Sequence, residues 1–159
     1  MTKEDAFNAA TFAFASYDGF FGAVAKAMGM EQALALQGQA DEVMGAMQGK
    51  MIKEQAGVDQ VDAQTAHALL ENIIATLGMS SEVIEASPQK VVLDAGRCPI
   101  YEAGLAVGME PAQIEAMCRA GPIKFMNAAA QQLNPDLSYS LQTFRSAPEE
   151  GCIEQIAFG

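Results

Sequence analysis

The sequence predicts an α+β fold in which a helical N-terminal layer packs on a small antiparallel sheet formed by the C-terminal half. Apolar residues repeat at helical spacing over most of residues 1–79, and short strand-like runs begin at residue 81. Glycine or proline separates successive segments. At 159 residues without an internal repeat, the chain fits one domain, 1–159, whose second part, 80–159, carries all three cysteines.

The first part is expected to begin with two long helices. The first runs from Asp5 to Met28, with a break or kink near Asp18-Gly19 because glycine weakens a helix interior. The second runs from Met30 to about Gln55. It contains three glycines that would let another backbone approach closely, namely Gly38, Gly45 and Gly49.

The remaining elements follow from apolar spacing and from turn residues. A third helix is marked by apolar residues from Ala66 to Leu77 and is ended by Gly78. A candidate hairpin then turns at Pro88. The elements expected from there on are strands 81–86 and 91–95, short helices from 98 to 107, 110 to 119 and 122 to 133, and two final strands, 137–143 and 152–158.

Composition excludes several classes of partner. The net charge is -11 with only nine Lys and Arg, so a basic face for nucleic acid or for an anionic membrane is not available. The apolar stretch from Ala9 to Met28 is broken by Asp18, Lys26 and glycines, so we expect no membrane span. An odd number of cysteines and no signal-peptide pattern favour reduced thiols in the cytoplasm.

The ten methionines fall on helical faces, which favours a role in filling the core. If the Gly/Ala/Met side of the second helix stays exposed, it would instead indicate a homo-oligomer, and the chain would then be a dimer-forming accessory subunit.

The segment around Cys98 is the strongest candidate for chemistry. An apolar run, 91–95, precedes Arg97-Cys98-Pro99, and proline belongs at the first position of a helix, which makes Cys98 the helix cap. The helix dipole and the neighbouring Arg97 would lower the pKa of a thiol there. The sequence therefore predicts either a reactive thiol or a helix cap that happens to be cysteine.

Other side chains could serve a thiol or a bound ligand. His67, the only histidine, and Glu102, one turn after Cys98, are candidate proton carriers. Each has an ordinary alternative, a structural histidine and a solvated carboxylate. The candidates for holding a small carboxylate and lining its pocket are Arg97, Arg119, Arg145, Tyr101 and Tyr139.

A metal site is a further hypothesis. No two cysteines have CxxC spacing, so zinc would need ligands from distant elements, Cys98, Cys118 and Cys152 with His67. The alternative is that Cys118 and Cys152 are small buried hydrophobic residues.

From Val91 onward the chain resembles the L-2-amino-thiazoline-4-carboxylic acid hydrolase-like family. The resemblance rests on the segment 97–103, on Cys118, on the segment 133–137 and on Glu150-Gly151-Cys152, with a weaker match at 30–34. The separated cysteines are also similar to those of the 4-vinyl reductase domain, a small-ligand or metal-binding module. The resemblance implies hydrolysis of a cyclic amidine-type C–N bond, with Cys98, Cys118 and Cys152 at shared positions.

Two functions therefore stand side by side. The first is a hydrolase of a small carboxylated heterocycle in which Cys98 is the nucleophile or a zinc ligand, an arginine holds the carboxylate, and His67 or Glu102 moves protons. The second is a non-catalytic small-ligand- or metal-binding sensor module with an apolar pocket between helices and sheet.

Overall fold

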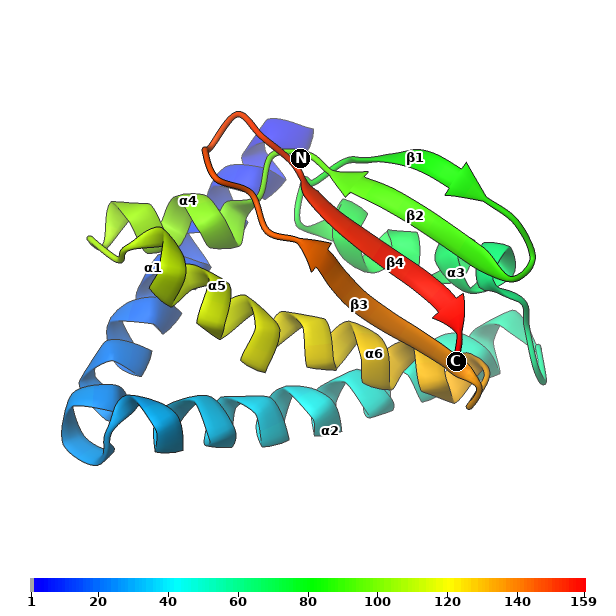
Figure 1. Cartoon of the computed structure of the whole chain (residues 1–159), viewed down its shortest axis with the longest axis horizontal. Helices are drawn as coiled ribbons and strands as arrows, with labels where there is room; N and C mark the ends of the chain where they lie inside the picture. Colours follow the sequence, from blue (N-terminus) through cyan, green and yellow to red (C-terminus); the bar gives the residue numbers. More distant parts are fainter. Residues whose placement is uncertain (1) are drawn as a thin grey trace.

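The computed structural model describes residues 2–159 and has the predicted α+β architecture (Figure 1). The helices lie mainly in the N-terminal part, and a four-stranded sheet is formed by the C-terminal part. In chain order the elements are α1 Lys3–Met28, α2 Met30–Ala56, α3 Ala63–Thr76, β1 Ser81–Ala86, β2 Lys90–Ala95, α4 Pro99–Ala106, α5 Pro111–Ala120, α6 Pro122–Leu133, β3 Leu137–Thr143 and β4 Cys152–Phe158.

The sheet is antiparallel throughout, with strand order β1-β2-β4-β3. The last strand, β4, therefore lies inside the sheet, between β2 and β3, as Figure 1 shows. Burial alternates along β2, where Val91, Leu93 and Ala95 are buried and the residues between them are half-buried. One face of the sheet is thus turned toward the helices and the other toward solvent.

Helix α1 is continuous, so of the break or kink expected near Asp18-Gly19 the break is wrong. A capping box between Thr2 and Asp5 fixes its start, and the buried Phe7 and Phe21 anchor it on both sides of Gly19. Gly19 faces open space, so its helix-weakening effect is outweighed by packing elsewhere on the helix.

Helix α2 packs on α6 through glycines, as predicted. A Cβ atom at Gly45 would lie 2.1 Å from the Phe125 carbonyl oxygen, and one at Gly49 would lie 2.4 Å from that of Ala129. The two backbones can approach this closely only because these residues lack side chains. Figure 1 shows α2 and α6 running alongside each other beneath the sheet.

The opposite side of α2 is exposed. The apolar face of Leu36, Val43, Met47 and Met51 is exposed by half or more, so the expectation that these methionines fill the core is wrong. The homo-oligomer that this face would suit remains a prediction.

The main core lies between α3, α6 and the inner face of the sheet. Its largest fully buried members include Leu70, Leu93, Leu133, Leu137 and Ile156. Beside this core, residues of α1, α5 and α6 and of the sheet line a hollow, which is the candidate site.

We predict opposite effects of alanine at two helical glycines. Gly45→Ala places a methyl group against the α6 backbone, so it should lower the free energy of unfolding by about 2 kcal/mol. Gly22→Ala is the control, because nothing lies within 4 Å of that position, and it should raise stability by about 0.5–1 kcal/mol. Urea unfolding followed by circular dichroism measures both, and equal effects would contradict the assigned α2–α6 contact.

Candidate ligand-binding cavity

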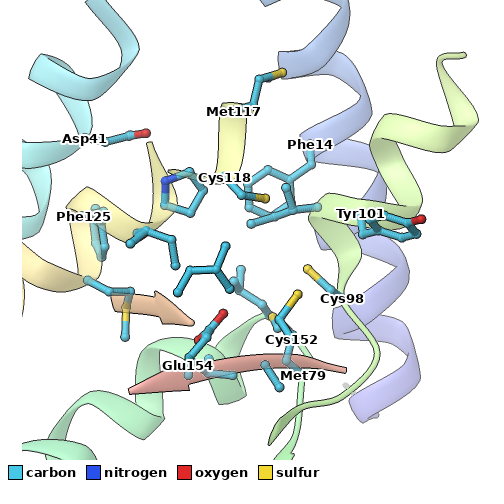
Figure 2. Close-up of a pocket in the computed structure, with 18 of the residues that line it drawn as sticks. Phe14, Asp41, Met79, Cys98, Tyr101, Met117, Cys118, Phe125, Cys152 and Glu154 are labelled. Carbon is cyan, nitrogen blue, oxygen red and sulfur yellow. The ribbon is translucent and has the colours of Figure 1, made fainter. Parts of the chain in front are cut away.

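A cavity of about 490 Å³ lies between α1, α5, α6 and the inner face of the sheet. Its wall is predominantly apolar, with aromatic, aliphatic and methionine side chains from elements far apart in the sequence (Figure 2). The polar exceptions are few, and they include the three cysteines, Arg145 and three acidic residues. Such a hollow has the size and lining of a small-molecule site.

The three cysteines share this cavity. Strand register sets Cys152, the first residue of β4, opposite Ala95, the last residue of β2, and Cys98 follows Ala95 by three residues. Cys118 reaches the cavity from α5. Figure 2 shows the sulfurs of Cys98, Cys118 and Cys152 directed into one hollow, and all three are free thiols.

The thiols do not form a ready metal centre. Among residues 2–159, no group of three or more His, Cys, Asp or Glu side chains is placed so that it could hold a metal ion. His67 is half-buried on α3 and is not part of the cavity wall, so the four-ligand set expected from the sequence is not brought together. Zinc stays a prediction without a preformed ligand cluster.

Cys98 is the N-cap of α4, as predicted, but the pKa of its thiol is raised and not lowered as expected. The residue has extended backbone angles and Pro99 follows it at the first helical position. Burial raises the pKa of the Cys98 thiol, and the Tyr101 and Ile100 backbone N–H groups and the Arg145 charge oppose this rise only in part. Burial, which the sequence does not reveal, raises the thiol pKa by more than the N-terminal end of the helix lowers it.

Two predicted site residues lie on the outer surface instead. Arg97 donates to Glu102 at 2.7 Å and to Glu4 at 3.1 Å, and its guanidinium stacks 4.0 Å from the centre of the Phe7 ring. Neither Arg97 nor Glu102 lines the cavity. Arg97 thus pairs with Glu102 of α4 and with Glu4 of α1, so these charges are engaged with each other at the surface.

Arg119 and His67 also lie away from the cavity wall. Arg119 pairs with Glu115 at 2.8 Å and donates to the Leu141 carbonyl oxygen at 3.1 Å, so it braces α5 against β3. Of the three predicted catalytic residues, Cys98, His67 and Glu102, only Cys98 reaches the cavity.

Arg145 and Tyr101 do line the cavity, as predicted. Arg145 is 3% exposed and donates to the carbonyl oxygens of Ala95 and Gly96, at 3.0 and 2.6 Å, and to the Cys152 Sγ at 3.3 Å. Its guanidinium carbon lies 5.4 Å from the centre of the Tyr101 ring. This arginine is therefore largely engaged by the protein itself.

On the sheet side, sequence reasoning missed Glu154. The Tyr139 hydroxyl, which was predicted to line the pocket, donates a hydrogen bond to its carboxylate. Burial raises the pKa of Glu154, while that bond and the Arg145 charge oppose the rise. The available signal was its position, since Glu154 lies on the same face of β4 as the buried Cys152 and Ile156.

On the α1 and α2 side, sequence reasoning missed Asp18, Gln37 and Asp41. Asp18 is only 5% exposed, and burial raises its pKa to about 6. Burial also raises the pKa of Asp41, and a hydrogen bond from Gln37 partly offsets it. The overlooked signal was spacing, because Asp18 continues the apolar stripe through Phe7, Phe14 and Phe21.

Comparisons of the chain with family models, with curated proteins and with solved structures found no match. The family resemblance of the cysteine segments consequently stays an expectation. Within residues 2–159, no helix combines the length and the apolar character needed to cross a membrane.

The raised pKa of Cys98 predicts slow alkylation near neutral pH. Since the thiolate is the nucleophile, a higher pKa leaves less of it at every pH below that value. We expect the pH midpoint for iodoacetamide labelling of Cys98 in the native protein to exceed that of the same residue in urea. Peptide mass spectrometry measures both rates, and a native midpoint at or below the urea value would contradict the assigned environment.

Proposed function

We propose that the protein is a binding module for a small, largely apolar molecule held between the helical layer and the sheet. The observation that carries this proposal is the cavity of about 490 Å³ with its apolar wall. Protein interiors are packed as densely as organic crystals and contain few voids larger than a water molecule. A hollow of this size is typical of a ligand site, since pockets for small molecules span about 300–1,000 Å³.

The distribution of polar groups supports binding over catalysis. A ligand site needs an apolar body with a few polar groups that fix orientation, and the cavity supplies these on two sides. A cysteine hydrolase would need a proton carrier beside its nucleophile. The predicted carriers, His67 and Glu102, lie outside the cavity, and burial raises the pKa of the Cys98 thiol.

Blocking the cavity tests the proposal. Ala13 is exposed at the cavity rim on α1, so Ala13→Trp can fill the hollow without disturbing the core. We expect this variant to bind the neutral dye N-phenyl-1-naphthylamine at least about tenfold more weakly, measured by dye fluorescence. Mass spectrometry of extracts should also find a co-purified small molecule in the wild type and not in the variant.

The matched control is Ala9→Trp, one helical turn away, exposed and outside the cavity wall. It should bind the dye as the wild type does. Equal dye binding by both variants, or no binding by the wild type, would overturn the proposal.

A hydrolase is the second candidate, and one contact favours it. Arg145 donates to the Cys152 Sγ at 3.3 Å, and the Cys98 and Cys118 thiols face the same hollow. On this hypothesis a thiol adds to the amidine-type carbon of a small carboxylated heterocycle, and the ring C–N bond breaks as its nitrogen takes up the thiol proton. Water then cleaves the new C–S bond, which releases the opened product and returns the free thiol.

The hydrolase hypothesis predicts that 2-aminothiazoline-4-carboxylate is ring-opened by the wild-type protein. Cys98→Ala or Cys152→Ala should then reduce the rate about 100-fold or more, as expected for loss of a nucleophile. Product formation is measured by mass spectrometry. No ring opening by the wild type, or full activity in both variants, would contradict catalysis by these thiols.

A further inference from the structure

More acidic than basic side chains face the cavity, and the basic one is already bound to other groups of the protein. Asp18 and Asp41 stand on the helical side, and Glu154 stands on the sheet side. Figure 2 shows Asp41 and Glu154 on opposite sides of the hollow, with apolar side chains between them and the three thiols to one side. The single cationic side chain among the lining residues, Arg145, is engaged by two backbone carbonyl oxygens and by Cys152.

The helical side offers hydrogen-bond acceptors that lack donors. Gln37 is 7% exposed, its amide nitrogen donates to the Met117 carbonyl oxygen, and its Oε1 is buried without any partner. Asp18 is 5% exposed, and burial alone accounts for the rise of its pKa to about 6, with no hydrogen bond or ion pair opposing it. A buried acceptor without a donor is costly, and a buried carboxylate more so.

These acceptors belong to one region of the wall. Asp18, Gln37 and Asp41 all line the cavity, and a Cβ atom at Gly121 would meet both the Gln37 and the Asp41 side chains. Burial raises the pKa of the neighbouring Tyr17 phenol, and the charges of Asp41 and Asp18 add to that rise. The Nζ of Lys124 lies against α2 at Gly38, but among the described residues it forms no salt bridge with either carboxylate.

We infer that the ligand is an amphipathic amine, a small molecule with an apolar body and one protonated nitrogen that faces the α1–α2 wall. This inference rests on the proposed binding function and names its ligand class. The ammonium supplies the donors that Asp18 and the Gln37 Oε1 lack, and its charge compensates the Asp18 carboxylate. The apolar body occupies the part of the hollow between α6 and the sheet.

Three probes of equal chain length, octylamine, octanol and octanoate, test the head-group preference by isothermal titration calorimetry. We expect octylamine to bind at least about tenfold more tightly than octanol, and octanoate to bind most weakly. Asp18→Asn should reduce the affinity for octylamine about tenfold or more and leave octanol binding unchanged. Unchanged octanol binding shows that the variant keeps its fold and its cavity.

The matched control is Asp59→Asn, which removes one carboxylate from an exposed turn outside the cavity. Because the whole protein carries a net charge of -11, this control separates general attraction of a cation from a specific site. Asp59→Asn should bind octylamine as the wild type does.

The outcomes separate the two proposals. If none of the three probes binds, the proposed binding function fails. If octanol or octanoate binds as well as octylamine, or if Asp18→Asn and Asp59→Asn behave alike, the cavity binds ligands but the amine preference is overturned.

Discussion

The buried Arg145 guanidinium is the interaction on which the site depends. It joins the end of β2, through the carbonyl oxygens of Ala95 and Gly96, to the start of β4 at Cys152. The chain leaves β2 at this point and enters α4 through Cys98, so the same contact sets where two of the three thiols lie. A buried guanidinium is tolerated only when its donors are satisfied, and the two strand ends that satisfy it are thereby fixed relative to each other. Arg145 lines an apolar cavity, but it therefore holds the two strand ends together and is not free to bind an anion.

A second constraint keeps the cavity open from the opposite side. The glycines of α2 hold that helix against α6, and α6 packs on the inner face of the sheet through the main core. Since α1 and α2 diverge from the turn at Gly29 (Figure 1), α1 runs away from this tightly packed pair, and its Phe14 and Asp18 line the cavity. The hollow is thus a consequence of close packing on one side and divergence on the other, which is a geometry that no single helix determines.

The elements could be predicted from the sequence much better than the site. Helical spacing, Pro99, Pro111 and Pro122 at helix starts and the alternation along β2 are local signals, and the structure confirms the elements that they predict. The convergence of Cys98, Cys118 and Cys152 on one cavity depends on strand register and could only be hypothesised.

Solvent exposure accounts for the site predictions that were wrong. The Cys98 thiol is desolvated, whereas Arg97 and Glu102 pair with each other at the surface. The spacing of these residues in the sequence predicts neither outcome. Asp18 was visible as an acid within an apolar stripe, but only the placement of α1 shows that the stripe faces a hollow.

The two polar sides of the cavity have different physical characters. On the sheet side the donors are already matched, since Tyr139 donates to Glu154 and Arg145 to backbone oxygens and a thiol. On the helical side the acceptors outnumber the donors, with Asp18 and the Gln37 Oε1 unpaired. A ligand that brings only apolar surface would leave that imbalance in place, and a carboxylate would add to it. A donor-rich or cationic group corrects it, because it gains charge-assisted hydrogen bonds in a setting of low dielectric constant where they are strongest. The unpaired acceptors of α1 and α2 therefore say more about the ligand than the cysteines do, since a buried acceptor requires a donor and a free thiol does not.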